Sequence, residues 1–232
     1  MASRARSIER LPEPEVMDDD AEAEAYEAAD FGRVNRAFAR RVRKLLSAPS
    51  GTALDLGTGP AEIPILVAGL APGWRITAVD ASPAMLALAR ERVRAAGLAE
   101  RITLRRGDAK RLRLESYCFD AVFSNSLLHH LHEPLPFWRE VARLGRPGAT
   151  VVVQDLRRPP SCAAARALVR RHTRSATPLL RQLFHQSLLA AFTPAEVREQ
   201  LRAAGLSLSV RATTDRHLVV SGTLAGEIGA DR

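Results

Sequence analysis

The residues with the clearest chemical potential lie in the stretch 52–64, whose sequence is TALDLGTGPAEIP. Its apolar start predicts a short buried strand, and Gly57 and Gly59 predict a tight turn that a ligand can approach closely. Apolar residues at helical spacing then predict a helix beginning near Ala61, whose free N–H groups face the turn. This combination is typical of a nucleotide-cofactor site. The dinucleotide fingerprint G-x-G-x-x-G is not met, because Glu62 stands at its last position.

Two aspartates follow the next predicted strands, at positions where a bound nucleoside would meet them. Residues 76–79 predict a strand that ends in Asp80, and residues 102–104 predict one that leads into Asp108. Asp80 lies 25 positions after Asp55. This is close to the interval of about 20 residues at which a dinucleotide fold places its ribose-binding acid. Either aspartate alone is also explained as a strand-end cap, but the two together favour a cofactor site.

The glycine stretch also fits the motif D/E-x-G-x-G-x-G/A, at Asp55, Gly57, Gly59 and Ala61. It resembles the first motif of the class I S-adenosylmethionine-dependent methyltransferases, and the resemblance extends over residues 50–222. The most similar branch acts on small molecules and includes the ubiquinone and menaquinone C-methyltransferases. Their tyrosine-rich entry motif is not clearly present, so the substrate does not carry over. A glycine turn that binds nothing is the alternative for this stretch taken alone.

The resemblance implies S-adenosyl-L-methionine as the cofactor and a methyl group as the group transferred. It implies that the glycine loop reaches the methionine portion, Asp80 the ribose, and Asp108 the adenine. The implied cofactor-binding residues are Asp55, Gly57, Thr58, Gly59, Asp80, Ala81, Asp108, Ala109 and Asn125.

Residues 120–124 predict the fourth strand. The segment after it, residues 125–131, reads NSLLHHL. In the family this segment lines the methyl-transfer pocket. His129 or His130 is a candidate general base for an acidic C–H, O–H or N–H group. The alternative is that each is a helix-start histidine bonded to a backbone carbonyl. No N/D-P-P-Y/F motif stands here, which disfavours adenine and glutamine as acceptors.

The N-terminal residues 1–28 turn from basic to acidic and contain few large apolar side chains. They predict a flexible or peripheral arm. A helix with one apolar and one arginine-rich face follows from Phe31. In the family a helix here covers the cofactor, which makes Tyr26, Phe31 and Asn35 candidates for closing the pocket. Ordinary packing is the alternative for Phe31.

Residues 156–192 predict an insertion of two helices between the fifth strand, Thr150 to Gln154, and a capping box that begins at Thr193. Because ligands bind at the carboxyl ends of such strands, we expect a substrate lid, with a homodimer contact as a second interpretation. Arg157 and Arg158 are candidates for binding an anionic group of the acceptor. The alternative is a solvated arginine face on ordinary core helices.

These elements predict one α/β fold with a Rossmann-like, seven-stranded, mostly parallel sheet, helices on both faces and a C-terminal antiparallel hairpin. An optional helix is expected between the third and fourth strands. The predicted methyltransferase domain covers residues 29–225, and residues 226–232 form a tail.

Composition limits the classes of function. The net charge of +8 invites a nucleic-acid interpretation, but the charge is scattered and a nucleic-acid partner is disfavoured. Two cysteines without metal-ligand spacing fit the cytoplasm and argue against a metal. Neither a membrane span nor a secretory signal is expected. The function predicted is methyl transfer to a small molecule. An RNA-modifying methyltransferase and a non-catalytic cofactor-binding regulatory protein are the alternatives.

Overall fold

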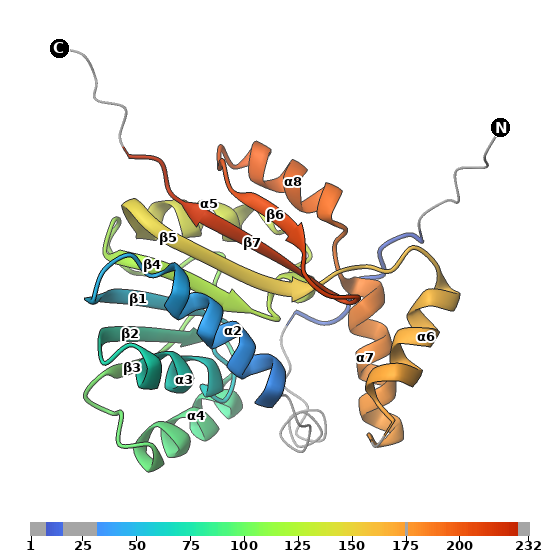
Figure 1. The fold of residues 1–232 in the computed structure, drawn as a ribbon, viewed down its shortest axis with the longest axis horizontal. Coiled ribbons are helices and arrows are strands. Elements are labelled where there is room, and N and C mark those ends of the chain that lie inside the picture. Colours follow the sequence, from blue (N-terminus) through green and yellow to red (C-terminus); the bar gives the residue numbers. More distant parts are fainter. Residues whose placement is uncertain (1–7, 16–31, 175, 227–232) are drawn as a thin grey trace.

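The computed structural model of the protein describes residues 8–15, 32–174 and 176–226. The strands in this part of the chain are β1 (Ser50–Leu56), β2 (Gly73–Asp80), β3 (Ile102–Arg106), β4 (Phe119–Asn125), β5 (Gly145–Leu156), β6 (Ser209–Ala212) and β7 (His217–Thr223). Within these described ranges they form a seven-stranded sheet in the order β3-β2-β1-β4-β5-β7-β6 (Figure 1).

The sheet is mostly parallel. Strands β1 to β5 pair in parallel, whereas β7 runs antiparallel to both of its neighbours, β5 and β6. The carboxyl ends of the parallel strands therefore meet at one edge of the sheet, where the predicted site residues stand. The predicted Rossmann-like α/β class and its C-terminal antiparallel hairpin are confirmed.

Helices cover both faces of the sheet (Figure 1). Their bounds are α2 (Gly32–Leu45), α3 (Glu62–Leu70), α4 (Pro83–Ala95), α5 (Leu135–Leu144), α6 (Cys162–His172), α7 (Pro178–Ala190) and α8 (Pro194–Ala203), with a short 3-10 helix η1 (Leu128–His130). Phe38, Val67 and Ala89 from α2, α3 and α4 share one buried cluster. Trp138 of α5 and Val197 of α8 belong to another. Burial of these apolar faces is the main stabilising contribution.

Two helix starts follow directly from the sequence. Ser82 caps α4, its Oγ accepting a hydrogen bond from the backbone N–H of Met85 at 3.3 Å. Thr193 opens α8 with the predicted capping box, in which Glu196 accepts a hydrogen bond from the Thr193 backbone N–H at 2.7 Å. Such a cap contributes about 1 kcal/mol to stability.

The optional helix between β3 and β4 does not form in residues 107–118. Side chains of α5 bind the backbone of this connection instead. Glu140 accepts a hydrogen bond from the Leu112 N–H at 2.9 Å, and Arg143 donates to the carbonyls of Leu112 and Leu114 at 3.0 and 2.8 Å. Because these backbone groups already have partners, the connection forms turns and irregular segments and no helix.

The inserted helices α6 and α7 lie beside the carboxyl end of β5 (Figure 1). They share a small apolar cluster built from Leu156, Leu168, Leu188 and Ala191. Leu179, at the start of α7, remains 37% exposed. Among the described helices, none combines the length and the apolar character that crossing a membrane requires.

The N-terminal segment 8–15 lies against the body of the protein. Arg10 donates hydrogen bonds to the carbonyls of Ala190, His129 and Leu131 at 2.6, 2.9 and 2.8 Å. The predicted flexible arm, residues 1–28, therefore contains a docked stretch, because its arginine meets carbonyls that lack helical partners. Tyr26 and the rest of the arm lie outside the described residues, and so does Phe31.

Candidate functional site

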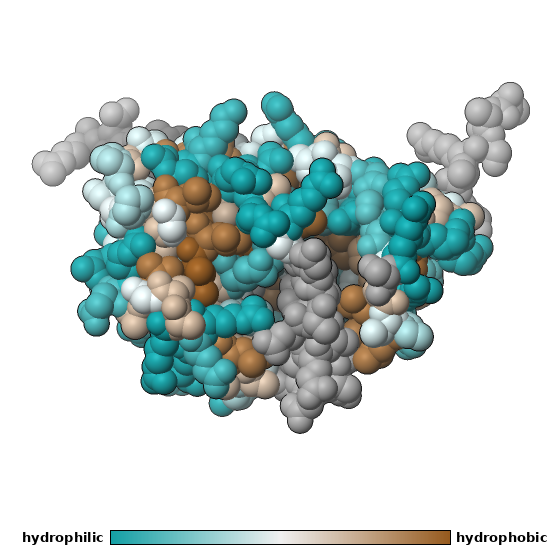
Figure 2. Space-filling view, turned by 60° about the horizontal axis from the view of Figure 1, so that its bottom comes forward, coloured by the Kyte–Doolittle hydropathy of each residue, from teal (hydrophilic) through white to brown (hydrophobic). Residues whose placement is uncertain are grey.

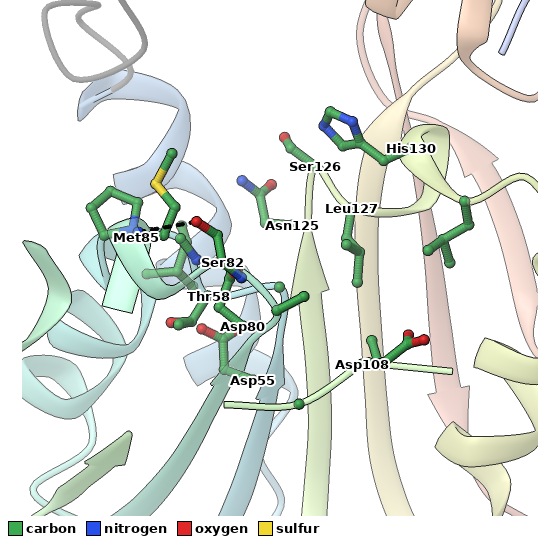
Figure 3. Close-up of a pocket in the computed structure, with 18 of the residues that line it drawn as sticks. Asp55, Thr58, Asp80, Ser82, Met85, Asp108, Asn125, Ser126, Leu127 and His130 are labelled. Carbon is green, nitrogen blue, oxygen red and sulfur yellow. Dashed lines mark hydrogen bonds between the residues drawn. The ribbon is translucent and has the colours of Figure 1, made fainter. Parts of the chain in front are cut away.

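A cavity of about 220 Å3 lies at the carboxyl ends of β1, β2 and β4 and beside the residues that follow β3 (Figure 3). It brings together all nine residues predicted to bind the cofactor. Asp55 and Asp80 lie on one side of the cavity, with Ser126 and His130 across from them (Figure 3).

On the surface seen when the bottom of Figure 1 is turned forward, hydrophilic side chains cover most of the area, and hydrophobic patches are separate from one another (Figure 2).

The glycine loop after β1 owes its shape to backbone angles that side chains rarely adopt. Gly57 and Gly59 have φ angles of 72° and 53°. A Cβ on Gly57 would lie 2.9 Å from the Leu127 side chain, whereas one on Gly59 would meet nothing within 4 Å. Gly57 is therefore required for packing, and Gly59 leaves open space where the loop faces the cavity.

Asp80 joins the loop to the end of β2. Its Oδ2 accepts a hydrogen bond from the Gly59 N–H at 2.7 Å, and its Oδ1 accepts one from the Ser82 N–H at 2.9 Å. Each carboxylate oxygen has a further lone pair. Asp80 thus holds the loop in place and still has acceptor capacity for the hydroxyl groups of a ribose.

Asp55 is a buried acid with an unmet oxygen. Within the described residues, neither Asp55 Oδ2 nor Thr58 Oγ1 has a hydrogen-bond partner at bonding geometry. Burial raises the pKa of Asp55 to about 7, the nearby Thr58 hydroxyl opposes this rise, and the charge of Asp80 adds to it. A buried carboxyl with an open acceptor beside a cavity suits a ligand that carries a positive charge or a donor.

The other predicted cofactor residues lie around the cavity rim. Asp108 accepts a hydrogen bond from the Lys110 N–H at 2.9 Å, and its side chain is 56% exposed. Asn125 accepts one from Gln154 at 2.9 Å. Asn35 of α2 also lines the cavity and donates to Glu62 at 2.8 Å. The prediction that α2 reaches the pocket through Asn35 agrees with this placement.

The two histidines of η1 have different surroundings. His130 lines the cavity, whereas His129 lies behind it and is only 4% exposed. Burial, followed by the neighbouring His129, lowers the pKa of His130 to about 3. Burial also lowers the pKa of His129, but the Asp155 carboxylate outweighs it and the pKa of His129 is raised overall.

Arg157 and Arg158 do not line the cavity. Arg158 is 6% exposed, forms an ion pair with Glu196 and donates to the carbonyl of Ala191 at 2.9 Å. Arg157 donates to the Thr214 carbonyl at 3.2 Å, near the β6–β7 turn. These contacts are to other parts of the chain, while Arg158 Nε has no hydrogen-bond partner within the described residues. Binding of an anionic group by the two arginines stays a prediction. Among the described residues, none from α6 or α7 lines the cavity either.

Several lining residues were not predicted from the sequence. They include Glu15, Glu62, Met85 and Lys110, whereas Ser126 and Leu127 belong to the segment that the resemblance placed at the methyl-transfer pocket. Ser126 has a positive φ of 59° at the cavity wall, and such strain in a non-glycine residue is concentrated at functional sites. Asp155 was also missed: it stands just before Leu156, the last residue of β5, and it is not part of the cavity lining. The same strand-end rule would have found it had the predicted strand extended beyond Gln154.

Comparison with known proteins identifies related sequences. Residues 54–153 match the family model described as "Methyltransferase domain". A phosphatidylethanolamine N-methyltransferase of Cereibacter sphaeroides is 34% identical over 124 residues, which are 53% of this chain and 59% of that protein. A demethylmenaquinone methyltransferase of Bacillus cytotoxicus is 31% identical over 112 residues, 48% of this chain and 47% of that protein. The chain thus spans about half the length of the curated relatives it matches.

Solved structures share the fold. An S-adenosylmethionine-dependent methyltransferase from Aquifex aeolicus superposes with a TM-score of 0.67 at 20% identity, covering 88% of this chain and 98% of its own. Phosphoethanolamine N-methyltransferase 2 of Haemonchus contortus, in complex with S-adenosyl-L-methionine, gives 0.68 at 17% identity, covering 90% and 58%. At these identities the likeness shows the fold alone.

Proposed function

We propose that this chain, whose residues 54–153 match a methyltransferase domain model, transfers the methyl group of S-adenosyl-L-methionine to a small-molecule acceptor. The observation that carries the proposal is the convergence of all nine predicted cofactor residues on a single cavity at the strand ends. By their names, the relatives reported above methylate phosphatidylethanolamine and demethylmenaquinone. A small acceptor is therefore favoured for this chain as well.

The residues around the cavity fit the cofactor part by part. Asp80, at the end of β2, accepts from the ribose hydroxyls, and the exposed carboxylate of Asp108 accepts from the adenine amino group. The open space at Gly59 admits the methionine portion. The unmet oxygen of Asp55 lies where it can accept from the ammonium group of that portion.

The bound sulfonium supplies a strongly electrophilic methyl group, so the protein mainly has to position the acceptor. His130 faces the cavity, and its low pKa of about 3 keeps it neutral at physiological pH. It is a weak base, and we assign it to orienting the acceptor through a hydrogen bond rather than to removing a proton. His129 lies behind the cavity wall and acts on the acceptor only through its neighbours.

The RNA-modifying alternative is favoured by one observation. The exposed face of α2 carries only basic charges and no acidic residue, at Arg33, Arg36, Arg40, Arg41, Arg43 and Lys44. Such a row is typical of a surface that contacts phosphates. It lies on the solvent side of the helix, whereas the opposite side packs through Phe38 and Val42.

Methyl transfer to defined acceptors separates these functions. Purified protein is incubated with S-adenosylmethionine and either small-molecule panels or transfer RNA, and S-adenosylhomocysteine is quantified. Small-molecule turnover supports the proposal. Methylation of transfer RNA, with affinity falling by orders of magnitude between about 50 and 200 mM salt, supports the RNA alternative. Cofactor binding without turnover of either class indicates a regulatory protein.

The cellular compartment and the oligomeric state of the protein are proposals as well. Cys118 and Cys162 are both free thiols, and free thiols suit a reducing compartment such as the cytoplasm. The lid role of residues 156–192 and the homodimer contact stay predictions, which the oligomeric state in solution and the acceptor kinetics of α7 variants test.

A further inference from the structure

Three potential metal ligands meet behind the rim of the cavity. Glu13 Oε1 lies 3.4 Å from His129 Nε2 and 3.1 Å from His130 Nδ1. The ligand atoms of the three residues all lie within 4.8 Å of one another. Glu13 comes from the docked N-terminal segment, whereas the histidines belong to η1, so the group is assembled only in the folded chain.

These separations match those of a tetrahedral site. Zinc–nitrogen and zinc–oxygen bonds of about 2.0–2.1 Å place neighbouring ligand atoms roughly 3.3 Å apart. The two distances to Glu13 Oε1 lie on either side of that value. Two histidines and one glutamate, with a fourth position left for an oxygen donor, form a ligand set of the catalytic zinc type.

Asp155 fixes the orientation of His129 from behind. Its Oδ1 accepts from His129 Nδ1 at 2.6 Å and from the Leu156 N–H at 2.6 Å, and its Oδ2 accepts from the Leu128 N–H at 2.6 Å. A proton on Nδ1 leaves the lone pair of Nε2 directed at Glu13. A carboxylate behind a ligating histidine is the usual outer partner in metal sites.

Glu13 is delivered by several contacts of its segment. The Ser187 hydroxyl of α7 donates to the two carboxylate oxygens at 3.2 and 3.3 Å. The His132 side chain lies 2.7 Å from the Glu13 carbonyl, and Arg10 anchors the segment three residues earlier. The ligand atoms are thus held close to their positions before any ion binds.

We propose that Glu13, His129 and His130 bind one divalent transition-metal ion, of which Zn2+ is the probe. The ion ties the N-terminal segment to η1 at the rim of the cavity, and its fourth position takes an oxygen donor. Sequence patterns do not indicate this site, because its ligands are far apart along the chain and the adjacent histidines match no ligand spacing.

The test is metal binding by tag-free protein that has been dialysed against a chelator. Zn2+ affinity is measured in competition with a chromophoric chelator, and Co2+ absorption reports the ligand geometry. Glu13→Gln and His130→Ala are the test variants. Glu9→Gln and His172→Ala are matched controls, because Glu9 is exposed on the same segment and His172 pairs with Asp215 elsewhere.

We expect one Zn2+ per chain and tetrahedral Co2+ bands in the wild type and in both controls. The test variants should lose at least about 10- to 100-fold in affinity, the range that loss of even an outer partner causes. Absence of Zn2+ binding in the wild type overturns the site, and so does equal affinity in Glu13→Gln. An equal loss in the controls also overturns it. Should His130→Ala not fold, Glu13→Gln decides alone, since Glu13 lies outside the sheet and its helices.

Discussion

The Asp80 carboxylate accepts a hydrogen bond from the backbone N–H of Gly59 at 2.7 Å. This contact joins the end of β2 to the glycine loop after β1. Because Asp80 also lines the cavity, one residue both shapes the loop and stands where a cofactor can meet it. The site is therefore pre-formed around a backbone contact and does not depend on the ligand to create the loop.

Asp80→Asn is expected to weaken binding of S-adenosylmethionine without unfolding the protein. A lost hydrogen bond to a charged group costs about 1.5–3 kcal/mol, or roughly 10- to 150-fold in affinity. Isothermal titration calorimetry measures the change. Asp215→Asn, in the distant β6–β7 turn, is the matched control and should bind as the wild type does. Unchanged affinity in Asp80→Asn would remove this residue from the site.

The raised pKa of Asp55 predicts a pH-dependent stability. Its pKa is about 7 in the folded protein against 3.8 in the unfolded chain. Between these values the folded state holds a proton that the unfolded state has released, so the free energy of unfolding falls as pH rises. The decrease reaches about 4 kcal/mol by pH 7. Urea unfolding of the wild type and of Asp55→Asn at several pH values measures it. Parallel pH profiles for the two proteins would contradict the assignment.

Cofactor binding should release a proton near neutral pH. An ammonium group beside Asp55 favours the ionised carboxylate and lowers its pKa on binding. Calorimetric titrations in buffers with different ionisation enthalpies, at pH 6.5, count the protons exchanged. We expect net release in the wild type and none in Asp55→Asn. Proton uptake, or identical values for the two proteins, would place the cofactor's ammonium group away from Asp55.

Arg158 is expected to act on stability and not on the acceptor. Removing it leaves Glu196 without its charge partner and the Ala191 carbonyl without its donor. Because Glu196 is 37% exposed, solvent compensates in part, and we expect Arg158→Ala to lower the free energy of unfolding by about 1–3 kcal/mol. Arg157→Ala is the control, with a change within about 0.5 kcal/mol. Chemical denaturation measures both. A raised KM for the acceptor with unchanged stability in Arg158→Ala would restore its predicted role in substrate binding.

The sequence predicts which loop and strand-end residues line the cavity because its signals are local. The tight turn after β1 needs positive φ angles, which Gly57 and Gly59 adopt readily. An acid at or just after the end of a parallel strand lies at the ligand-binding edge of the sheet, whatever element follows it. Asp80 and Asp108 were found in this way. The fold class follows from the same alternation of strands and helices.

The rest of the site depends on contacts between distant parts of the chain, which periodicity does not show. The charge of Arg158 and its place after β5 suggest an anion site, yet tertiary packing places its side chain against Glu196. Glu13 belongs to an acidic stretch that predicts an arm, yet it meets the η1 histidines. Leu45 and Leu70 fit apolar helical spacing but are 39% and 43% exposed, because each is the last residue of its helix. Local sequence patterns therefore predict the type of a helix or strand better than the residues it will contact.

A crystal structure of the complex with S-adenosylhomocysteine tests the central claim most directly. The proposed function predicts the product in the cavity at the strand ends, with Asp80 within hydrogen-bond distance of the ribose hydroxyls and the adenine beside Asp108. The homocysteine portion should pass Gly59 and place its amino group near Asp55. A cavity that stays free of the product at saturating concentration, or a product bound at another surface, would contradict the account.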